Sequence, residues 1–311
     1  MIGRRLFFFT TTALAIMFLL FYIVYHNDIV DHIRSIQYAY LGYLIIIVTF
    51  IQFFNGLLLR DLATKFGIGL SPKEWIGLPY ITSLGNYITP FSGGMIARAA
   101  YLKLRHTLSY ANFASVFAAS SILLFWIAGV IGTVATIAFE YSSKYFYELI
   151  AFFISPVLVL SCIALFPIIQ IPGEHVLIKT FNNVITGWKL IRTDYRLLGR
   201  LSLYTFIIVL LNGISFWFAF VALSYNSLSP GKILLISLFS AFSIIIRVTP
   251  GSLGVTEAVV GFSSGILGCG VNLGLAVSLL IRAASLIPVC ILGPIFSLLL
   301  SYGVSIRRRD I

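Results

Sequence analysis

The chain has 311 residues, of which 59% are hydrophobic and only 10% are charged, and its mean hydropathy is +1.02. A soluble globular domain has about 25% charged residues, so the composition excludes an ordinary soluble protein and indicates a helical membrane protein. The net charge of +11 does not indicate nucleic-acid binding, because the basic residues lie between apolar runs, where they set membrane topology. The cysteines lie in apolar segments and the histidines are scattered, so we expect neither disulfides nor a metal site.

Six apolar runs are long enough to cross a bilayer. They cover residues 6–25, 40–59, 110–139, 149–171, 201–225 and 273–302. The first run lacks the short core and the small-residue cleavage site of a secretory signal, so we expect it to be an uncleaved span. Together the runs predict an all-helical polytopic membrane protein, with one integral membrane domain over residues 1–311.

Two shorter apolar stretches are interrupted by similar residues in the same order. The first interruption reads Thr-Pro-Phe-Ser-Gly-Gly over 89–94, and the second reads Thr-Pro-Gly-Ser-Leu-Gly over 249–254. A break at lipid depth frees backbone groups that only protein or water can satisfy, and matching breaks in two halves of a chain point to a transporter's binding site. The alternative is a pair of ordinary kinked helices. The predicted tips of the two broken elements are formed by Pro90, Gly93, Gly94, Pro250, Gly251 and Gly254.

The distribution of basic residues predicts the orientation of these elements. If the broken elements 72–105 and 230–270 are re-entrant hairpins, most of the 21 lysines and arginines lie on one side. The positive-inside rule identifies that side as cytoplasmic, and both termini lie there. Three full spans between the hairpins then invert the second hairpin relative to the first. We therefore expect an inverted repeat, with halves of about 40–138 and 201–302, whose two tips meet near the middle of the membrane.

The polar segment 172–200 carries apolar side chains at steps of three and four, and mostly basic side chains on the other face. This pattern predicts an amphipathic helix on the cytoplasmic side. Two alternatives are open for its apolar face: it lies in the lipid headgroup layer, or it packs on the protein's own helices. The pattern favours neither alternative.

Few charged residues fall at membrane depth, where charges are costly and tend to mark function. Three arginines and one carboxylate favour an anionic ligand such as a lipid phosphate, because a guanidinium pairs with phosphate through two hydrogen bonds. Backbone N–H groups at the helix starts after the two breaks would add donors. The alternative is an internal pair of Glu257 with Arg282 or Arg247 that only holds the halves together. The predicted substrate-binding residues are Arg98, Arg247, Glu257 and Arg282, and the residues that line the site or satisfy the broken backbone are Asn86, Thr89 and Ser252.

Catalytic chemistry is poorly supported by the sequence. It has ten acidic residues, and it shows no paired carboxylates, metal-ligand motif or phosphate-binding loop. We therefore expect no enzyme activity, no catalytic residue, no metal and no cofactor.

The residues at the two breaks resemble a known family. Pro90-x-x-x-Gly94-x-x-x-Arg98 resembles the P-x-x-x-G-E-x-x-R stretch of the lysylphosphatidylglycerol synthase transmembrane family, also called the flippase-like domain family. The run from Pro250 to Glu257 resembles its PGGxGxxE stretch. An arginine also follows in the next span, and the resemblance covers nearly the whole chain. It implies a bacterial inner-membrane protein that translocates an anionic lipid or a lipid-linked glycan, without ATP hydrolysis by this chain.

The sequence departs from that family in two places. Met95 stands where the family often has an acidic residue, and Ala-Ser-Ser at 119–121 stands where an arginine is often seen. The first half is therefore expected to lack a charge pair. Only residues 307–311 follow the last span, so we expect no soluble aminoacyl-transferase domain and no synthesis of lysyl-lipid.

The alternative function is a non-transporting membrane scaffold for an enzyme that modifies lipids or polysaccharides. The expected partners are the membrane and an anionic lipid or lipid-linked substrate, with a partner enzyme or a second copy of the chain left open. The lipid, the transport direction and the energy source are also left open by the sequence.

Overall fold

The structure is a computed structural model that describes residues 38–165, 172, 176–225, 229–246 and 248–307. Within these ranges the chain forms ten α-helices and two short 3-10 turns, and no strand. The bounds are α3 Tyr38–Thr64, α4 Pro72–Ile88, α5 Gly93–His106, α6 Tyr110–Phe139, α7 Phe146–Leu165, α8 Val176–Arg192, α9 Tyr195–Ala222, α10 Pro230–Phe242, η1 Ser243–Ile245, η2 Pro250–Ser252, α11 Val255–Ile266 and α12 Val271–Arg307.

Five helices are long and apolar enough to cross a membrane, namely α3, α6, α7, α9 and α12. They correspond to five of the six predicted spans, and the all-helical class is confirmed for the described part of the chain. The sixth prediction, over residues 6–25, lies outside the described residues. A shorter apolar helix over Pro230–Ile245 belongs to the second broken element.

The amphipathic segment forms α8, and the structure decides between the two alternatives for its apolar face. Ile185, Trp188 and Ile191 are buried, and α8 packs along α6. The described part of the apolar face, over residues 185–191, therefore packs on the protein's own helices. The predicted segment 172–200 is divided, because α8 ends at Arg192 and a new helix begins at Tyr195, where the Asp194 side chain accepts a hydrogen bond from the N–H of Leu197 at 3.0 Å.

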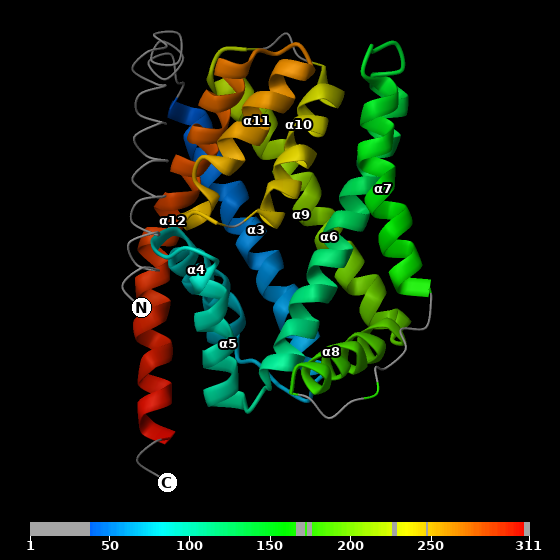
Figure 1. Cartoon of the computed structure of the whole chain (residues 1–311). Coiled ribbons are helices and arrows are strands. Elements are labelled where there is room, and N and C mark those ends of the chain that lie inside the picture. The colour runs from blue at the N-terminus through cyan, green and yellow to red at the C-terminus, as the bar shows by residue number, and fades with distance from the viewer. Residues whose placement is uncertain (1–37, 166–171, 173–175, 226–228, 247, 308–311) are drawn as a thin grey trace, which may run out of the picture.

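Each broken element folds into two short helices that pack against each other, α4 with α5 and α10 with α11. The central helices α3 and α9 pack along one another, while α4 lies against α12 and α10 lies against α6. In Figure 1 the α4–α5 pair extends from the lower end of the bundle and the α10–α11 pair from the upper end. The two breaks meet between them, where η2 contacts α4.

Candidate functional site

The first break begins at the end of α4, which Pro90 terminates. The residue before a proline is disfavoured in helical conformation, and Thr89 is extended, with φ −122° and ψ 148°. Its hydroxyl and its N–H both donate to the carbonyl oxygen of Gly85, at 2.5 and 2.9 Å. Phe91 and Ser92 then adopt left-handed conformations, with φ of 50° and 55°. The chain thereby reverses, and the Thr89 hydroxyl satisfies backbone at the helix end.

The second break repeats this order of conformations. Thr249 is extended, with φ −92° and ψ 157°. Gly251 and Ser252, which follow the proline, are left-handed, with φ of 57° and 53°. The Thr249 hydroxyl donates to the carbonyl oxygen of Leu253 at 2.7 Å. The repeated sequence pattern therefore has a repeated backbone conformation, and both threonines stabilise the break in which they lie.

A buried ion pair holds the second break against α12. Arg282 Nε donates to Glu257 Oε1 at 2.5 Å, and its Nη1 donates to the carbonyl oxygen of Gly251 at 2.9 Å. The other oxygen of Glu257 accepts from the N–H of Gly254 at 2.8 Å. Glu257 is 1% exposed. The structure thus contains the internal Glu257–Arg282 pair, and the carboxylate occupies the start of α11, where backbone donors for an anion had been expected.

Two adjoining cavities lie at the breaks. The tip cavity, of about 200 Å³, lies between Asn86 and Tyr87 of α4 and Gly251 and Ser252 of the second break. The α5–α6 cavity, of about 330 Å³, lies among α3, α4, α5 and α6. The two cavities share the lining residues Ser83, Asn86 and Ile244.

Among the described residues that line the α5–α6 cavity, Arg98 is the one that carries a charge. Its guanidinium carbon lies 5.5 Å from the ring centroid of Phe113, and one guanidinium nitrogen lies 3.1 Å from the sulfur of Met95. The predicted charged residues therefore fall into two groups, with Arg98 at the cavity and Glu257 with Arg282 at the second break. The remaining one, Arg247, lies outside the described residues.

The sequence matches the family described as the lysylphosphatidylglycerol synthase TM region over residues 7–293, a range that contains both breaks and the buried ion pair. The chain belongs to that family. No curated protein and no solved structure matches it. The match confirms the family resemblance and relates this membrane region to proteins linked to lipid modification or translocation.

In this member of the family, the two broken elements differ at the position of the ion pair. Met95 is the third residue of α5, as Glu257 is of α11, and Ser121 is the twelfth residue of α6, as Arg282 is of α12. Met95 and Ser121 both line the α5–α6 cavity. Moreover, α11 packs closely along α12, whereas α5 makes few contacts with α6. The first broken element therefore borders a cavity at the position where the second holds a charge pair.

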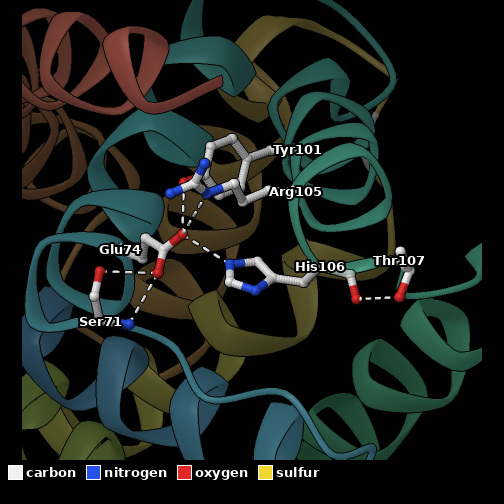
Figure 2. A network of polar contacts seen from close by, with 6 residues as sticks. All are labelled: Ser71, Glu74, Tyr101, Arg105, His106 and Thr107. Atoms are coloured by element: carbon white, nitrogen blue, oxygen red, sulfur yellow. Dashed lines mark hydrogen bonds and ion pairs between the residues drawn. The ribbon is translucent and has the colours of Figure 1, made fainter. Parts of the chain in front are cut away.

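Sequence reasoning missed a polar cluster at the base of the first hairpin, which Figure 2 shows. Glu74 of α4 accepts hydrogen bonds from the N–H and the hydroxyl of Ser71, both at 2.8 Å, and from the hydroxyl of Tyr101 at 2.7 Å. His106 Nε2 lies 2.7 Å from the same carboxylate, and Arg105 lies 4.0 Å away. The start of α4 is thereby tied to the end of α5. The signal in the sequence that could have indicated part of this cluster is the Ser-x-x-Glu capping box at 71–74.

The Glu74 cluster predicts acid sensitivity. Burial disfavours the charged form, but hydrogen bonds from Ser71, Tyr101 and His106 outweigh burial and lower the pKa of Glu74 from 4.5 to about 2. Because the folded-state pKa is depressed, the stability contribution is present above about pH 4.5 and is lost as pH falls toward 2. We expect Glu74→Gln to lower the free energy of unfolding by on the order of 3 kcal/mol at neutral pH.

Thermal unfolding of the detergent-solubilised protein checks this expectation across the pH range. The melting temperatures of the wild type and Glu74→Gln should converge at acid pH. The control is Glu148→Gln, since Glu148 is exposed, and its effect should be small at every pH. A difference between wild type and Glu74→Gln that stays constant from neutral to acid pH would contradict the prediction.

Proposed function

We propose that this protein moves a lipid with an anionic headgroup, or a lipid-linked glycan, across the membrane through the two cavities. The observation that carries the proposal is the meeting of two helix breaks, from opposite ends of the bundle, at adjoining cavities whose linings include polar side chains. Broken backbone inside a membrane is tolerated where it is buried in protein or lines a water-filled cavity, and such breaks in two halves of a transporter mark its binding site.

The proposal includes the membrane orientation. The two broken elements, 72–105 and 230–270, are re-entrant hairpins of an inverted repeat with halves of about 40–138 and 201–302, and both termini are cytoplasmic in a bacterial inner membrane. The repeated backbone conformations and the opposite directions of the two hairpins support this arrangement. Cysteines placed at Ser71 and Ser229, the first residues before α4 and α10, should react with a membrane-impermeant maleimide from opposite sides. Labelling of both from one side would contradict it.

The proposed roles follow the positions of the residues. Arg98 binds the anionic group, because a guanidinium forms strong charge-assisted hydrogen bonds with phosphate. Asn86 and Ser252 line the cavities along the path. The Glu257–Arg282 pair shapes the second break. Arg247 stays a candidate from the sequence, and no catalytic step is assigned to this chain.

Translocation in proteoliposomes tests the proposal. The probe is phosphatidylglycerol with a fluorescent acyl chain, and dithionite added outside destroys the fluorescence of probe in the outer leaflet. Wild type should move probe between leaflets faster than protein-free vesicles. We expect Arg98→Gln to slow this movement by about tenfold or more, the effect of losing a hydrogen bond to a charged group.

Arg196→Gln is the matched control, because Arg196 is an exposed arginine of α9. It should leave the rate unchanged. Wild-type protein that moves this probe no faster than protein-free vesicles would count against translocation and favour the scaffold alternative. An unchanged rate in Arg98→Gln would remove Arg98 from the path.

A further inference from the structure

We infer that the α5–α6 cavity selects a headgroup that is both anionic and rich in hydroxyl groups, a polyol phosphate or glycosyl phosphate, over a cationic aminoacylated headgroup. The inference rests on the proposed function, because it names the substrate class of the same site. It follows from the charge, the donors and the acceptors that line the cavity.

The charge of the lining disfavours a cationic headgroup. Arg98 lines the cavity, and no aspartate or glutamate does so among the described residues. Glu257, which could otherwise serve a cation, is buried against Arg282. A cation away from water needs a paired anion, and the described lining offers the amine of an aminoacylated lipid a guanidinium but no carboxylate.

The hydroxyl groups of the lining are mainly acceptors toward a ligand. Ser120 and Ser121 donate their protons to carbonyl oxygens of α6, at 2.9 and 3.0 Å. Thr82 and Thr205 donate in the same way within their own helices, at 2.7 and 2.8 Å. A hydroxyl has one proton to donate but two lone pairs to accept with. These side chains therefore present acceptor capacity, which a phosphate oxygen cannot use and a ligand hydroxyl can.

The side-chain amide of Asn86, which lines the cavity, also has an oxygen that needs a hydrogen-bond donor. The Oδ1 atom of Asn86 is buried and accepts no hydrogen bond from the described residues. By contrast, the amide of Gln52, another lining residue, has a partner, because its Nε2 donates to the hydroxyl of Ser83 at 2.9 Å. Leaving a buried acceptor unsatisfied is unfavourable, and buried polar groups are almost always hydrogen-bonded. Asn86 lines both cavities, so a hydroxyl-bearing headgroup would satisfy it at the point where the path passes between the breaks.

The size of the cavity agrees with a headgroup rather than a whole lipid. Its volume of about 330 Å³ is at the lower end of the roughly 300–1,000 Å³ found for small-molecule sites. The neutral side chains of Met95 and Ser121 contribute to its walls, in the positions where the second half has its ion pair. Because Met95 and Ser121 stand in place of an ion pair, this part of the cavity has space and carries no carboxylate.

Native mass spectrometry of the detergent-solubilised protein tests the inference by competition. Equal amounts of phosphatidylinositol, phosphatidic acid and lysyl-phosphatidylglycerol with matched acyl chains are added. The first is anionic with a polyol, the second is anionic without one, and the third carries amines. We expect wild type to retain phosphatidylinositol most, and Asn86→Ala to reduce its preference over phosphatidic acid by about fivefold, the effect of one net hydrogen bond.

Asn183→Ala is the control, because Asn183 is an exposed asparagine of α8, and it should keep the wild-type preference. Equal retention of phosphatidylinositol and phosphatidic acid by wild type, or stronger retention of lysyl-phosphatidylglycerol, would overturn the inference. The proposed function is tested separately by the translocation assay. Selective binding without movement of any probe would contradict translocation alone, and movement of all three headgroups at equal rates would contradict the selectivity alone.

Discussion

Glu257→Gln is expected to destabilise the protein by about 3–5 kcal/mol, because it removes one member of a buried ion pair and leaves the other charge uncompensated. Glu257 is 1% exposed, and the side chain of Arg282 is 12% exposed. A glutamine retains an oxygen for the N–H of Gly254 but has no charge to balance the guanidinium. Thermal unfolding in detergent should show a large fall in melting temperature, together with loss of lipid movement.

A double variant distinguishes the effect of losing the whole ion pair from the effect of leaving one charge unpaired. Replacing both residues with glutamine removes the charge imbalance, so Glu257→Gln with Arg282→Gln should be more stable than Glu257→Gln alone. The control is Glu148→Gln at an exposed position. If Glu257→Gln melts at the wild-type temperature, the pair does not hold the second break.

Gly94→Ala is expected to open the first hairpin, because α4 and α5 touch through backbone at this position. A Cβ atom added at Gly94 would overlap the carbonyl oxygen of Thr82 and lie 2.8 Å from the backbone nitrogen of Asn86. A Cβ at Gly85 would lie 2.6 Å from the Cα of Gly94. Backbone cannot yield as a side chain does, so the destabilisation should reach or exceed about 3 kcal/mol, the upper range for overpacking.

Gly199→Ala is the matched control for this substitution. Gly199 lies in α9, and a Cβ atom added there would meet nothing within 4 Å. In a helix, alanine is more favourable than glycine by about 0.5–1 kcal/mol, so Gly199→Ala should raise the melting temperature slightly while Gly94→Ala lowers it. Equal effects of the two substitutions would show that the close approach of α4 and α5 does not constrain the hairpin.

The breaks were predictable from the sequence because their chemistry is local. A proline restricts the residue before it, so Thr89 and Thr249 mark the ends of helical segments without knowledge of the rest of the fold. The apolar runs likewise identified five spans by length alone. The end of α8 was harder to place, because the apolar spacing continues past Asp194 into α9.

The contacts between distant segments were not predictable in the same way. The sequence left Glu257 with two candidate partners, and the choice of Arg282 depends on how α11 packs on α12. The capping box at Glu74 was readable, but the contacts with Tyr101 and His106 require α5 to return along α4. The cavities depend on the packing of several helices at once, so no single stretch of sequence specifies them.

The unequal packing of α5 and α11 has a consequence for motion. α11 is held along α12 and by the Glu257–Arg282 pair, whereas α5 is held mainly by α4 and by the Glu74 cluster at its end. Local opening requires least free energy where few buried contacts are lost. Amide hydrogens of α5 should therefore exchange with solvent faster than those of α11. The two hairpins have similar backbone conformations at their breaks, but the first would then be the more mobile and the second the more rigid.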